Sequence, residues 1–342
     1  MLNSIPNADM LDQILSEPTE GVVDTLGRLD GDIIILGAGG KMGPTLALMA
    51  KRASGMAGKS RKIIGVSRFS DERLLAQLNS AGIETIKCDL LNWGELESLP
   101  DASNVIYMAG MKFGSTGNES LTWAMNTYLP GMVCQKYRSS KIIAFSSGNI
   151  YGLTSIVHGG SAESDAPNPT GEYAISVLGR ERMLEHFSKT LDIPAATIRL
   201  NYATELRYGV LVDLAVKIAN GEPVDLTMGN VNVIWQGDAN AMILRTFDHV
   251  STPPFIINIA GPETLSIRRV AEQMASLMHK EVKFTGTESP DGILSNGHLG
   301  HKLFGYPRTS IGEVIECTAD WVMRGGEILG KPTHFETRDG KF

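Results

Sequence analysis

The chain has 342 residues, too many for one ordinary hydrophobic core, so we expect one large domain with an added lobe, or two domains. Its hydrophobic content of 42% is that of a globular protein, and its net charge of −7, without clustered Lys and Arg, argues against a nucleic acid partner. Three widely spaced cysteines exclude a disulfide framework and the usual zinc spacing. Without a signal-peptide pattern or a membrane-span pattern, the expected compartment is the cytoplasm and no membrane partner is expected.

Residues 1–30 are predicted to be an extension, with one short helix over 8–15 packed as a strap on the domain surface. From residue 32 onwards, short apolar runs alternate with amphipathic segments. The apolar runs predict strands over 32–36, 62–67, 84–88, 104–109, 141–146 and 195–200. The segments between them predict helices over 43–53, 71–81, 121–138 and 173–189. Because such alternation builds parallel βαβ units, residues 31–200 predict an α/β fold with a doubly wound parallel Rossmann sheet.

After residue 201 the alternation loosens, and Gly and Pro become frequent. Helices are still predicted over 208–220, 239–250, 266–279 and 311–324. We expect residues 201–342 to form a smaller mixed lobe over the carboxyl ends of the strands, where open α/β sheets bind ligands, with the chain free to cross between the two lobes.

Three glycines, Gly37, Gly40 and Gly43, lie where the first predicted strand turns into a helix. A dinucleotide site needs glycine there, because the chain turns tightly, the backbone approaches a pyrophosphate and the helix packs closely on the sheet. The amide groups at the helix N-terminus then favour the negative phosphates. In this context the loop, including Lys41 and Met42, is predicted to bind NAD or NADP.

The second predicted strand ends in Ser67-Arg68. An acid at this point would bond the adenosine ribose hydroxyls and select NAD. The sequence has a guanidinium instead, whose fork suits a 2′-phosphate, so NADP is favoured over NAD. The alternative for Arg68 is an ordinary surface arginine.

Several short segments in a fixed order carry a resemblance to a known family. They are Asp89-Leu90, Met108-Ala109-Gly110-Met111-Lys112, Asn126, Phe145-Ser146-Ser147-Gly148-Asn149-Ile150-Tyr151-Gly152, Glu163 and Tyr173, and in the lobe Trp235-Gln236-Gly237-Asp238, Asn258-Ile259-Ala260-Gly261 and Leu303-Phe304-Gly305-Tyr306. With the GxxGxxG spacing, they make residues 32 to about 321 resemble the extended short-chain dehydrogenase/reductase family, the NAD-dependent epimerases and dehydratases of sugar nucleotides.

The resemblance implies roles for individual residues. Ser147 corresponds to the catalytic serine, and Tyr173 to the catalytic tyrosine, which also contacts the cofactor. The other implied cofactor contacts are Asp89, Leu90, Met108, Ala109, Gly110, Lys112 and Asn126. The candidate substrate contacts are Ser147, Asn149, Asn201, Tyr202, Arg207 and Trp235, with burial or a surface position as the alternative for the last two. The family's usual dimer surface, here helices 121–138 and 173–189, implies a homodimer.

One departure from the family pattern affects the chemistry. The family has a lysine four positions after the tyrosine, and this chain has Val177. A lysine there would lower the pKa of the tyrosine from about 10 towards neutrality. Three explanations are open: another lysine such as Lys112 supplies the charge, the chemistry needs less from the tyrosine, or the chain binds a dinucleotide without turnover. Arg180, two helical turns beyond Tyr173, is expected to be a poor substitute by reach.

The sequence thus favours an NAD(P)-dependent enzyme that moves a hydride between the cofactor and a hydroxylated, sugar-like or sugar-acid substrate. Ser147 would hold the reacting oxygen, and Tyr173 would exchange its proton. The alternative is a dinucleotide-binding sensor or scaffold without catalysis.

Overall fold

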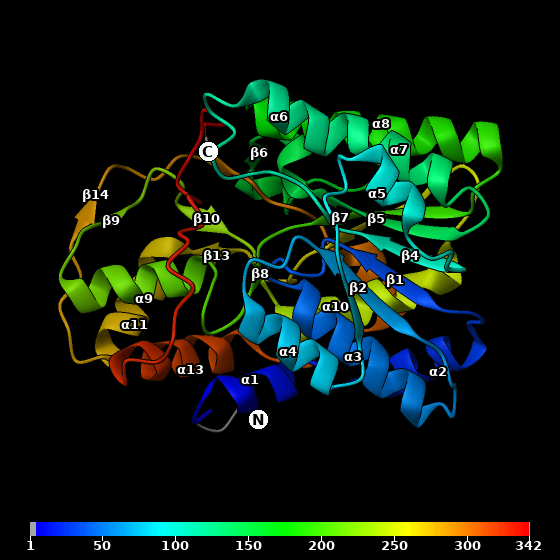
Figure 1. Ribbon diagram of the computed structural model, residues 1–342. Helices are drawn as coiled ribbons and strands as arrows, with labels where there is room; N and C mark the ends of the chain where they lie inside the picture. The colour runs from blue at the N-terminus through cyan, green and yellow to red at the C-terminus, as the bar shows by residue number, and fades with distance from the viewer. Residues whose placement is uncertain (1–4, 342) are drawn as a thin grey trace.

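A seven-stranded parallel sheet lies at the centre of the computed structural model, which describes residues 5–341 (Figure 1). The strand order is β12-β7-β5-β4-β1-β2-β3. The strands are β1 (Ile33–Leu36), β2 (Ile63–Ser67), β3 (Glu84–Lys87), β4 (Asn104–Tyr107), β5 (Lys141–Ser147), β7 (Ala195–Leu200) and β12 (Phe255–Ile259). Because the chain runs outward from β1 to β3 and then returns to β4, the order reverses between β1 and β4, which is where such sheets bind ligands.

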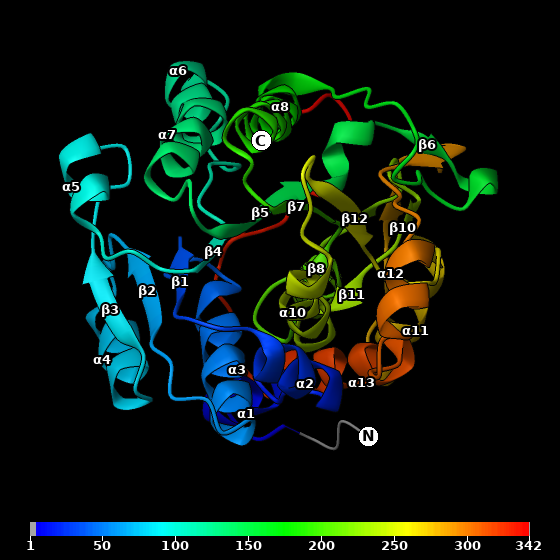
Figure 2. The ribbon, with the colours of Figure 1, turned by 90° about the vertical axis from the view of Figure 1, so that its right-hand side faces the viewer.

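Helices cover both faces of this sheet (Figure 1, Figure 2). One layer holds α2 (Glu20–Arg28), α3 (Gly43–Met56), α4 (Glu72–Ser80) and α10 (Gln236–Arg245). The other holds α5 (Trp93–Ser98), α6 (Glu119–Trp123), a π-helical turn (Ala124–Tyr128), α7 (Leu129–Lys136) and α8 (Gly171–Leu191). The buried aliphatic residues of β1 supply both cores, since Ile33 and Ile35 pack in the first layer while Ile34 and Leu36 pack in the second.

The second half of the chain builds a lobe beside the sheet, around a separate apolar core. Its helices are α9 (Val210–Asn220), α11 (Ile267–Leu277) and α13 (Ile311–Met323), whereas α12 (His298–Phe304) packs against β12 and α10. Four pairs of short strands complete it: β8 (Ala203–Thr204) with β11 (Ile234–Trp235), β9 (Val224–Asp225) with β14 (Phe284–Thr285), β10 (Asn230–Val231) with β13 (Leu265–Ser266), and β6 (Thr154–Ser155) with β15 (Asp291–Gly292). Single 3-10 turns occupy Gly148–Tyr151, Ile156–His158 and Thr246–His249.

The N-terminal extension is part of both cores, not a strap on the surface. Leu11 and Leu15 of α1 (Ala8–Leu15) are fully buried in the lobe core. Val22 and Leu26 of α2 are fully buried in the core beneath the sheet. The expectation of a surface strap was wrong because the apolar faces of both helices are covered by the two cores that they bridge.

The predicted Rossmann fold is confirmed, with two differences in detail. The helix expected over 121–138 is divided by the π-helical turn at Ala124–Tyr128 and ends at Lys136. The strand β12 and the helix α10 follow residue 201 in sequence yet belong to the central sheet and its helical layer, so the chain does cross back from the lobe. Within residues 5–341, no helix has the length and apolar character needed to cross a bilayer.

Candidate cofactor and substrate site

Two connected cavities open at the carboxyl ends of the central strands, with volumes of about 870 Å³ and about 350 Å³. Both are lined by Gly37, Gly40, Met108, Gly110, Met111, Lys112 and Phe113. The larger cavity continues past the ends of β2 and β3, and the smaller continues past the ends of β5 and β7 towards the lobe. Together they form one elongated cleft across the switch point of the sheet.

The glycine loop between β1 and α3 is shaped by two glycines and kept open by the third. Gly37 has φ +100°, and a Cβ on it would lie 2.7 Å from the Ala109 nitrogen. A Cβ on Gly43 would lie 2.4 Å from the Ala38 carbonyl oxygen. A Cβ on Gly40 would meet only the Gly37 oxygen, at 3.3 Å, and would project into the cleft. Gly37 and Gly43 therefore serve the fold, whereas Gly40 leaves space for a ligand.

The start of α3 completes a cradle that suits a dinucleotide. No side chain caps this helix, and Pro44 occupies its first turn, so its first amide groups point towards the loop without a side-chain acceptor. A helix N-terminus of this kind favours phosphate through its unpaired N–H groups and its dipole. The open position at Gly40 and the uncapped helix thus fit the pyrophosphate of a bound NAD or NADP.

The larger cavity gathers the residues expected around the adenosine. It is lined by Ser67, Arg68, Asp89, Leu90 and Ala109, together with Phe69, Leu74 and Leu91. The Arg68 side chain is exposed and makes no ion pair within residues 5–341. A carboxylate oxygen of Asp89 accepts a hydrogen bond from the Leu91 nitrogen at 3.1 Å, which fixes the loop after β3 at the edge of this cavity.

The smaller cavity brings together the predicted serine and tyrosine. Ser147 ends β5, accepts a hydrogen bond from the Asn149 nitrogen at 3.2 Å and donates one to the Asn149 Oδ1 at 3.1 Å. Burial raises the pKa of Tyr173, while a hydrogen bond with the Ser147 side chain and the charge of Arg180 oppose that rise. A serine and a tyrosine so joined can hold a hydroxyl or carbonyl oxygen and pass a proton to or from it.

A model of the NAD-dependent epimerase/dehydratase family matches residues 33–231, which is more than half of the chain. The chain belongs to this family. The resemblance seen in the sequence motifs is therefore confirmed, and the match spans the glycine loop, Ser147 and Tyr173.

Solved structures of similar fold agree with this assignment. A UDP-glucuronic acid 4-epimerase from Bacillus cereus is 17% identical, with a TM-score of 0.72, and the alignment covers 86% of this chain and 99% of that one. A UDP-glucose 4-epimerase from Thermotoga maritima is 16% identical, with a TM-score of 0.71 and the same coverage. A dTDP-glucose 4,6-dehydratase from Bacillus anthracis is 15% identical, with a TM-score of 0.72, covering 86% and 96%. No curated protein matches the chain significantly.

Val177, at the position of the family's lysine, faces away from the cleft. Its side chain is 1% exposed and packs with Ile150 and Tyr151 in a small apolar cluster, against which Tyr173 also rests. Val177 does not line either cavity. The chain has therefore built an apolar contact where the family has an ammonium group.

Arg180 reaches the smaller cavity, so the expectation that it lies too far away was wrong. Side chains on a helix lean towards its N-terminus, and a residue seven positions on returns to the same face, so Arg180 shares the cavity with Tyr173 and its charge opposes the rise in the pKa of that phenol. It is buried and donates to the Phe145 carbonyl at 2.8 Å and to the Asn126 Oδ1 at 2.8 Å. Gly110 leaves room for it, because a Cβ there would lie 2.4 Å from the Arg180 Nη2.

Two lysines from different loops enter the cleft. The Lys112 ammonium lies 5.9 Å from the Tyr173 ring centroid and donates to the Thr333 carbonyl at 3.3 Å, and burial lowers its pKa to about 8. The Lys41 ammonium lies 3.3 Å from the Tyr208 ring centroid and 4.3 Å from that of Phe113. Burial, and then repulsion by Lys112, lowers the Lys41 pKa to about 7. Within residues 5–341, Lys41 makes no ion pair.

The structure divides the remaining candidate residues into two groups. Asn149, Asn201 and Tyr202 line the smaller cavity, as does Met42. Asn126 is buried behind the cavity wall, where it holds Arg180 and accepts from the Met111 nitrogen at 2.9 Å. It therefore positions the site without lining it.

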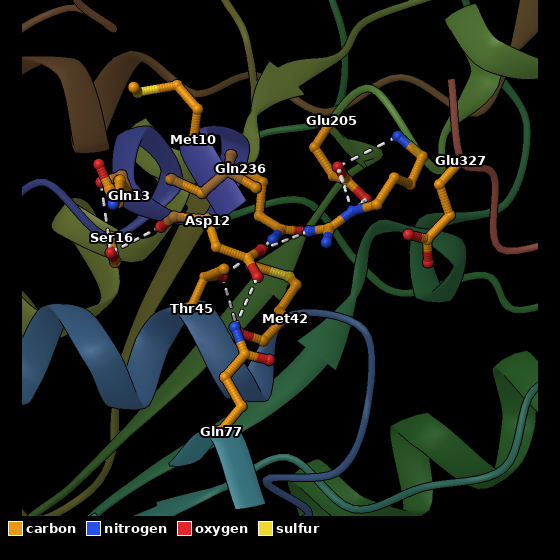
Figure 3. Close-up of polar contacts among 12 residues, drawn as sticks. Met10, Asp12, Gln13, Ser16, Met42, Thr45, Gln77, Glu205, Gln236 and Glu327 are labelled. Atoms are coloured by element: carbon orange, nitrogen blue, oxygen red, sulfur yellow. Dashed lines mark hydrogen bonds and ion pairs between the residues drawn. The ribbon is translucent and has the colours of Figure 1, made fainter. Parts of the chain in front are cut away.

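Arg207 and Trp235 are not brought to the cleft. Arg207 forms ion pairs with Glu205 at 3.1 Å and with Asp12 of the N-terminal extension at 2.7 Å. Figure 3 labels the two acidic partners, Glu205 and Asp12. Trp235 is 3% exposed and packs in the lobe core. The expectation that they contact substrate was wrong, because both side chains are occupied by contacts between the lobe and the extension.

Some lining residues had no signal in the sequence. Tyr208 and Phe113 place their rings beside Lys41, while Lys331 and Thr333 come from the segment that follows α13. Sequence reasoning missed these four residues because none belongs to a family motif. The cation-π contacts that select Tyr208 and Phe113 exist only after the loops meet.

Proposed function

We propose that the chain is an NAD(P)-dependent enzyme that oxidises or reduces a carbon atom of a hydroxylated, sugar-like or sugar-acid substrate. The observation that supports this proposal is the hydrogen-bonded pair of Ser147 and Tyr173 in a cavity continuous with the glycine loop. NAD or NADP bound along the cleft would exchange a hydride with the substrate. Gly37, Gly40, Met42 and the start of α3 would hold its pyrophosphate, and Ser67, Arg68, Asp89 and Leu90 its adenosine.

In this proposal Ser147 binds the reacting oxygen and Tyr173 takes or gives its proton. A buried tyrosine needs a nearby positive charge to do so near neutral pH. We infer that Arg180 supplies that charge in place of the absent lysine, because its guanidinium lines the same cavity and its charge opposes the rise in the pKa of Tyr173. Lys112 adds a second positive group near the tyrosine ring.

The Tyr173→Phe variant tests this assignment. Since only the phenol hydroxyl is removed, we expect kcat to fall by about 10²–10⁴ while the dissociation constant for the cofactor stays unchanged. The measurement is the absorbance of reduced nicotinamide with NAD or NADP and a panel of polyols, sugars and sugar acids. The exposed Tyr306, converted to Phe, is the matched control and should behave as the parent.

A non-catalytic dinucleotide sensor is the alternative, and the apolar packing of Val177 is the observation that favours it. A sensor would bind the cofactor tightly, yet no member of the panel would change its redox state. Bound cofactor that is reduced by any one of these compounds would support the enzyme instead.

The preference for NADP rests on Arg68, at the exposed end of β2. We expect Arg68→Ala to weaken NADP by about 1.5–3 kcal/mol, since one charge-assisted pair with the 2′-phosphate is lost, and to leave NAD almost unaffected. Titration calorimetry with both cofactors measures the difference. Arg138→Ala, at an exposed arginine beyond α7, is the control. An equal loss for NAD and NADP would contradict the role of Arg68.

We also propose a homodimer through the face of α6, α7 and α8. Three large apolar side chains of these elements are exposed, namely Trp123, Tyr128 and Ile175. Exposed apolar side chains that gather on one face of a globular protein often mark an interface. The cytoplasmic location stays a prediction from the sequence.

A further inference from the structure

The segment that follows α13 runs between the sheet and the lobe. It leaves the far end of the lobe, crosses the front of the molecule and ends beside the start of α8 (Figure 1). The view turned by 90° shows the same course, behind the sheet and up to α8 (Figure 2). The Leu329 nitrogen donates to the Arg207 carbonyl at 2.9 Å, which ties the beginning of the segment to the lobe.

Specific side-chain contacts hold this segment against the lobe. The Asp213 Oδ2 accepts from the Thr333 nitrogen at 2.8 Å and from the Thr333 hydroxyl at 2.5 Å. Phe335 is 1% exposed and packs in the lobe core. Arg338 forms an ion pair with Asp291 at 2.5 Å. Because Phe335 is buried and Arg338 is ion-paired, this segment is an ordered part of the fold.

The far end of the segment packs against the helix that carries Tyr173. A Cβ on Gly340 would lie 2.2 Å from the Thr170 carbonyl oxygen, and a Cβ on Gly171 would lie 2.4 Å from the Gly340 oxygen. Both glycines have positive φ, of +72° and +82°. The two backbones therefore touch directly, at the first turn of α8 and two residues before Tyr173.

Between these anchors, the segment forms a wall of the cleft. Thr333 lines the smaller cavity, Lys331 lines the larger, and the Thr333 carbonyl accepts from Lys112 at 3.3 Å. The smaller cavity that remains, about 350 Å³, is near the lower end of the roughly 300–1,000 Å³ typical of small-molecule sites. Part of it must also hold the nicotinamide end of the cofactor. With Thr333 and Lys331 in its walls, the cleft leaves little room for a nucleotide attached to the substrate.

The polar character of the smaller cavity is that of an anion site. Lys41 is half-buried between two aromatic rings and forms no ion pair within residues 5–341, although the charge of Asp213 acts on it. A desolvated ammonium without a partner is costly unless a ligand supplies the negative charge. That charge can come from the cofactor's pyrophosphate or from a carboxylate on the substrate. The tyrosines Tyr173, Tyr202 and Tyr208 line the same cavity and offer hydroxyls for a polyol.

We propose that residues 330–340 are a built-in wall of the substrate site, which restricts the substrate to a small hydroxylated acid without an attached nucleotide. This inference rests on the proposed function, because it assigns the substrate class of the same site. The proposal distinguishes this chain from a sugar-nucleotide enzyme by the position of residues 330–340 in the wall of the substrate site. It identifies Thr333 and Lys41 as specificity residues.

Binding to the full-length chain, saturated with NAD, tests the proposal. The probes for titration calorimetry are D-glucuronate, D-gluconate and D-glycerate, the neutral polyol D-glucitol, and UDP-glucuronate. We expect at least one free acid to bind, D-glucitol to bind about tenfold more weakly or worse for want of the charge-assisted contact, and UDP-glucuronate to give no binding. UDP-glucuronate bound as tightly as glucuronate, or no binding of any free acid, overturns the proposal. Failure of both NAD and NADP to bind would instead contradict the proposed function.

Two variants distinguish the steric effect of residues 330–340 from the electrostatic effect of Lys41. Gly340→Val forces the segment away from Thr170, so we expect UDP-glucuronate to gain access and free-acid affinity to fall about tenfold, with NAD affinity retained. Gly312→Val, at a position where a Cβ meets nothing within 4 Å, is the control for an added valine. If Gly340→Val melts at the parent's temperature and still does not bind UDP-glucuronate, the claim that residues 330–340 exclude the nucleotide is refuted.

The second variant, Lys41→Met, distinguishes the two sources of negative charge. A loss of free-acid affinity in the NAD-loaded protein, with NAD affinity reduced less, assigns Lys41 to the substrate carboxylate. A loss of NAD affinity alone assigns Lys41 to the pyrophosphate and overturns the acidic part of the proposal.

Discussion

Gly40→Val is expected to abolish NAD and NADP binding and to leave the protein folded. A Cβ at this position would meet only the Gly37 oxygen, at 3.3 Å, so a small shift of that carbonyl accommodates it. The branched side chain would nevertheless project into the cleft, where the pyrophosphate must approach the backbone. We expect affinity to fall by roughly 100-fold or more, because an approach path is blocked and every contact of the pyrophosphate is displaced. Titration calorimetry measures the affinity, and a melting curve verifies the fold.

Gly37→Val is the informative comparison for this prediction. Its Cβ would lie 2.7 Å from the Ala109 nitrogen, and its φ of +100° is strained for any L side chain. We therefore expect Gly37→Val to lose stability, by about 1–3 kcal/mol from backbone strain alone. Undiminished cofactor binding in Gly40→Val would refute the placement of the pyrophosphate at the glycine loop.

Val177→Lys is expected to destabilise the protein and not to restore a lost activity. The new ammonium would enter the apolar cluster of Ile150 and Tyr151, where Val177 is 1% exposed, and would have no partner there. An uncompensated buried charge costs about 3–5 kcal/mol. The rest of the family's motif is present in Ser147, Tyr151 and Tyr173, so we interpret the site as rebuilt around valine and not as decayed.

Urea unfolding of Val177→Lys and Val177→Met tests this interpretation. Methionine has a similar length without the charge, so it separates overpacking, which costs about 1–3 kcal/mol, from burial of the ammonium. We expect the lysine variant to be clearly less stable than the methionine variant. A lysine variant as stable as the parent, and markedly faster with any sugar substrate, would show that the site has simply lost its lysine.

Much of the cofactor half could be predicted because its signals are local. The alternation of apolar strands with amphipathic helices, and glycines at the first strand-helix turn, reflect contacts between residues close in the chain. Ser147 ends a strand of the same sheet and Tyr173 begins the next long helix, so the parallel topology brings both to one edge. Once the motifs are recognised, the positions of Ser147 and Tyr173 follow from the alternation of strands and helices.

Contacts between distant segments could not be predicted. Arg207 was an open candidate for substrate binding until the extension placed Asp12 beside it, 195 residues away in sequence. The reach of Arg180 was misjudged because the lean of a helical side chain and the space left by Gly110 are properties of the assembled site. No pattern marked residues 330–340 as part of the cleft.

The sequence by itself determined the family, the Rossmann sheet, the glycine loop and the serine-tyrosine pair, because each is encoded in local periodicity or a short ordered motif. The tertiary structure decided that Arg180 lines the same cavity as Tyr173 and that Thr333 and Lys331 line the cleft. Arg180 reaches the site across two helical turns, and the segment after α13 returns to it from the far end of the lobe. Such placements depend on backbone approaches as close as those of Gly340 and Gly171, which arise only when elements distant in sequence pack together.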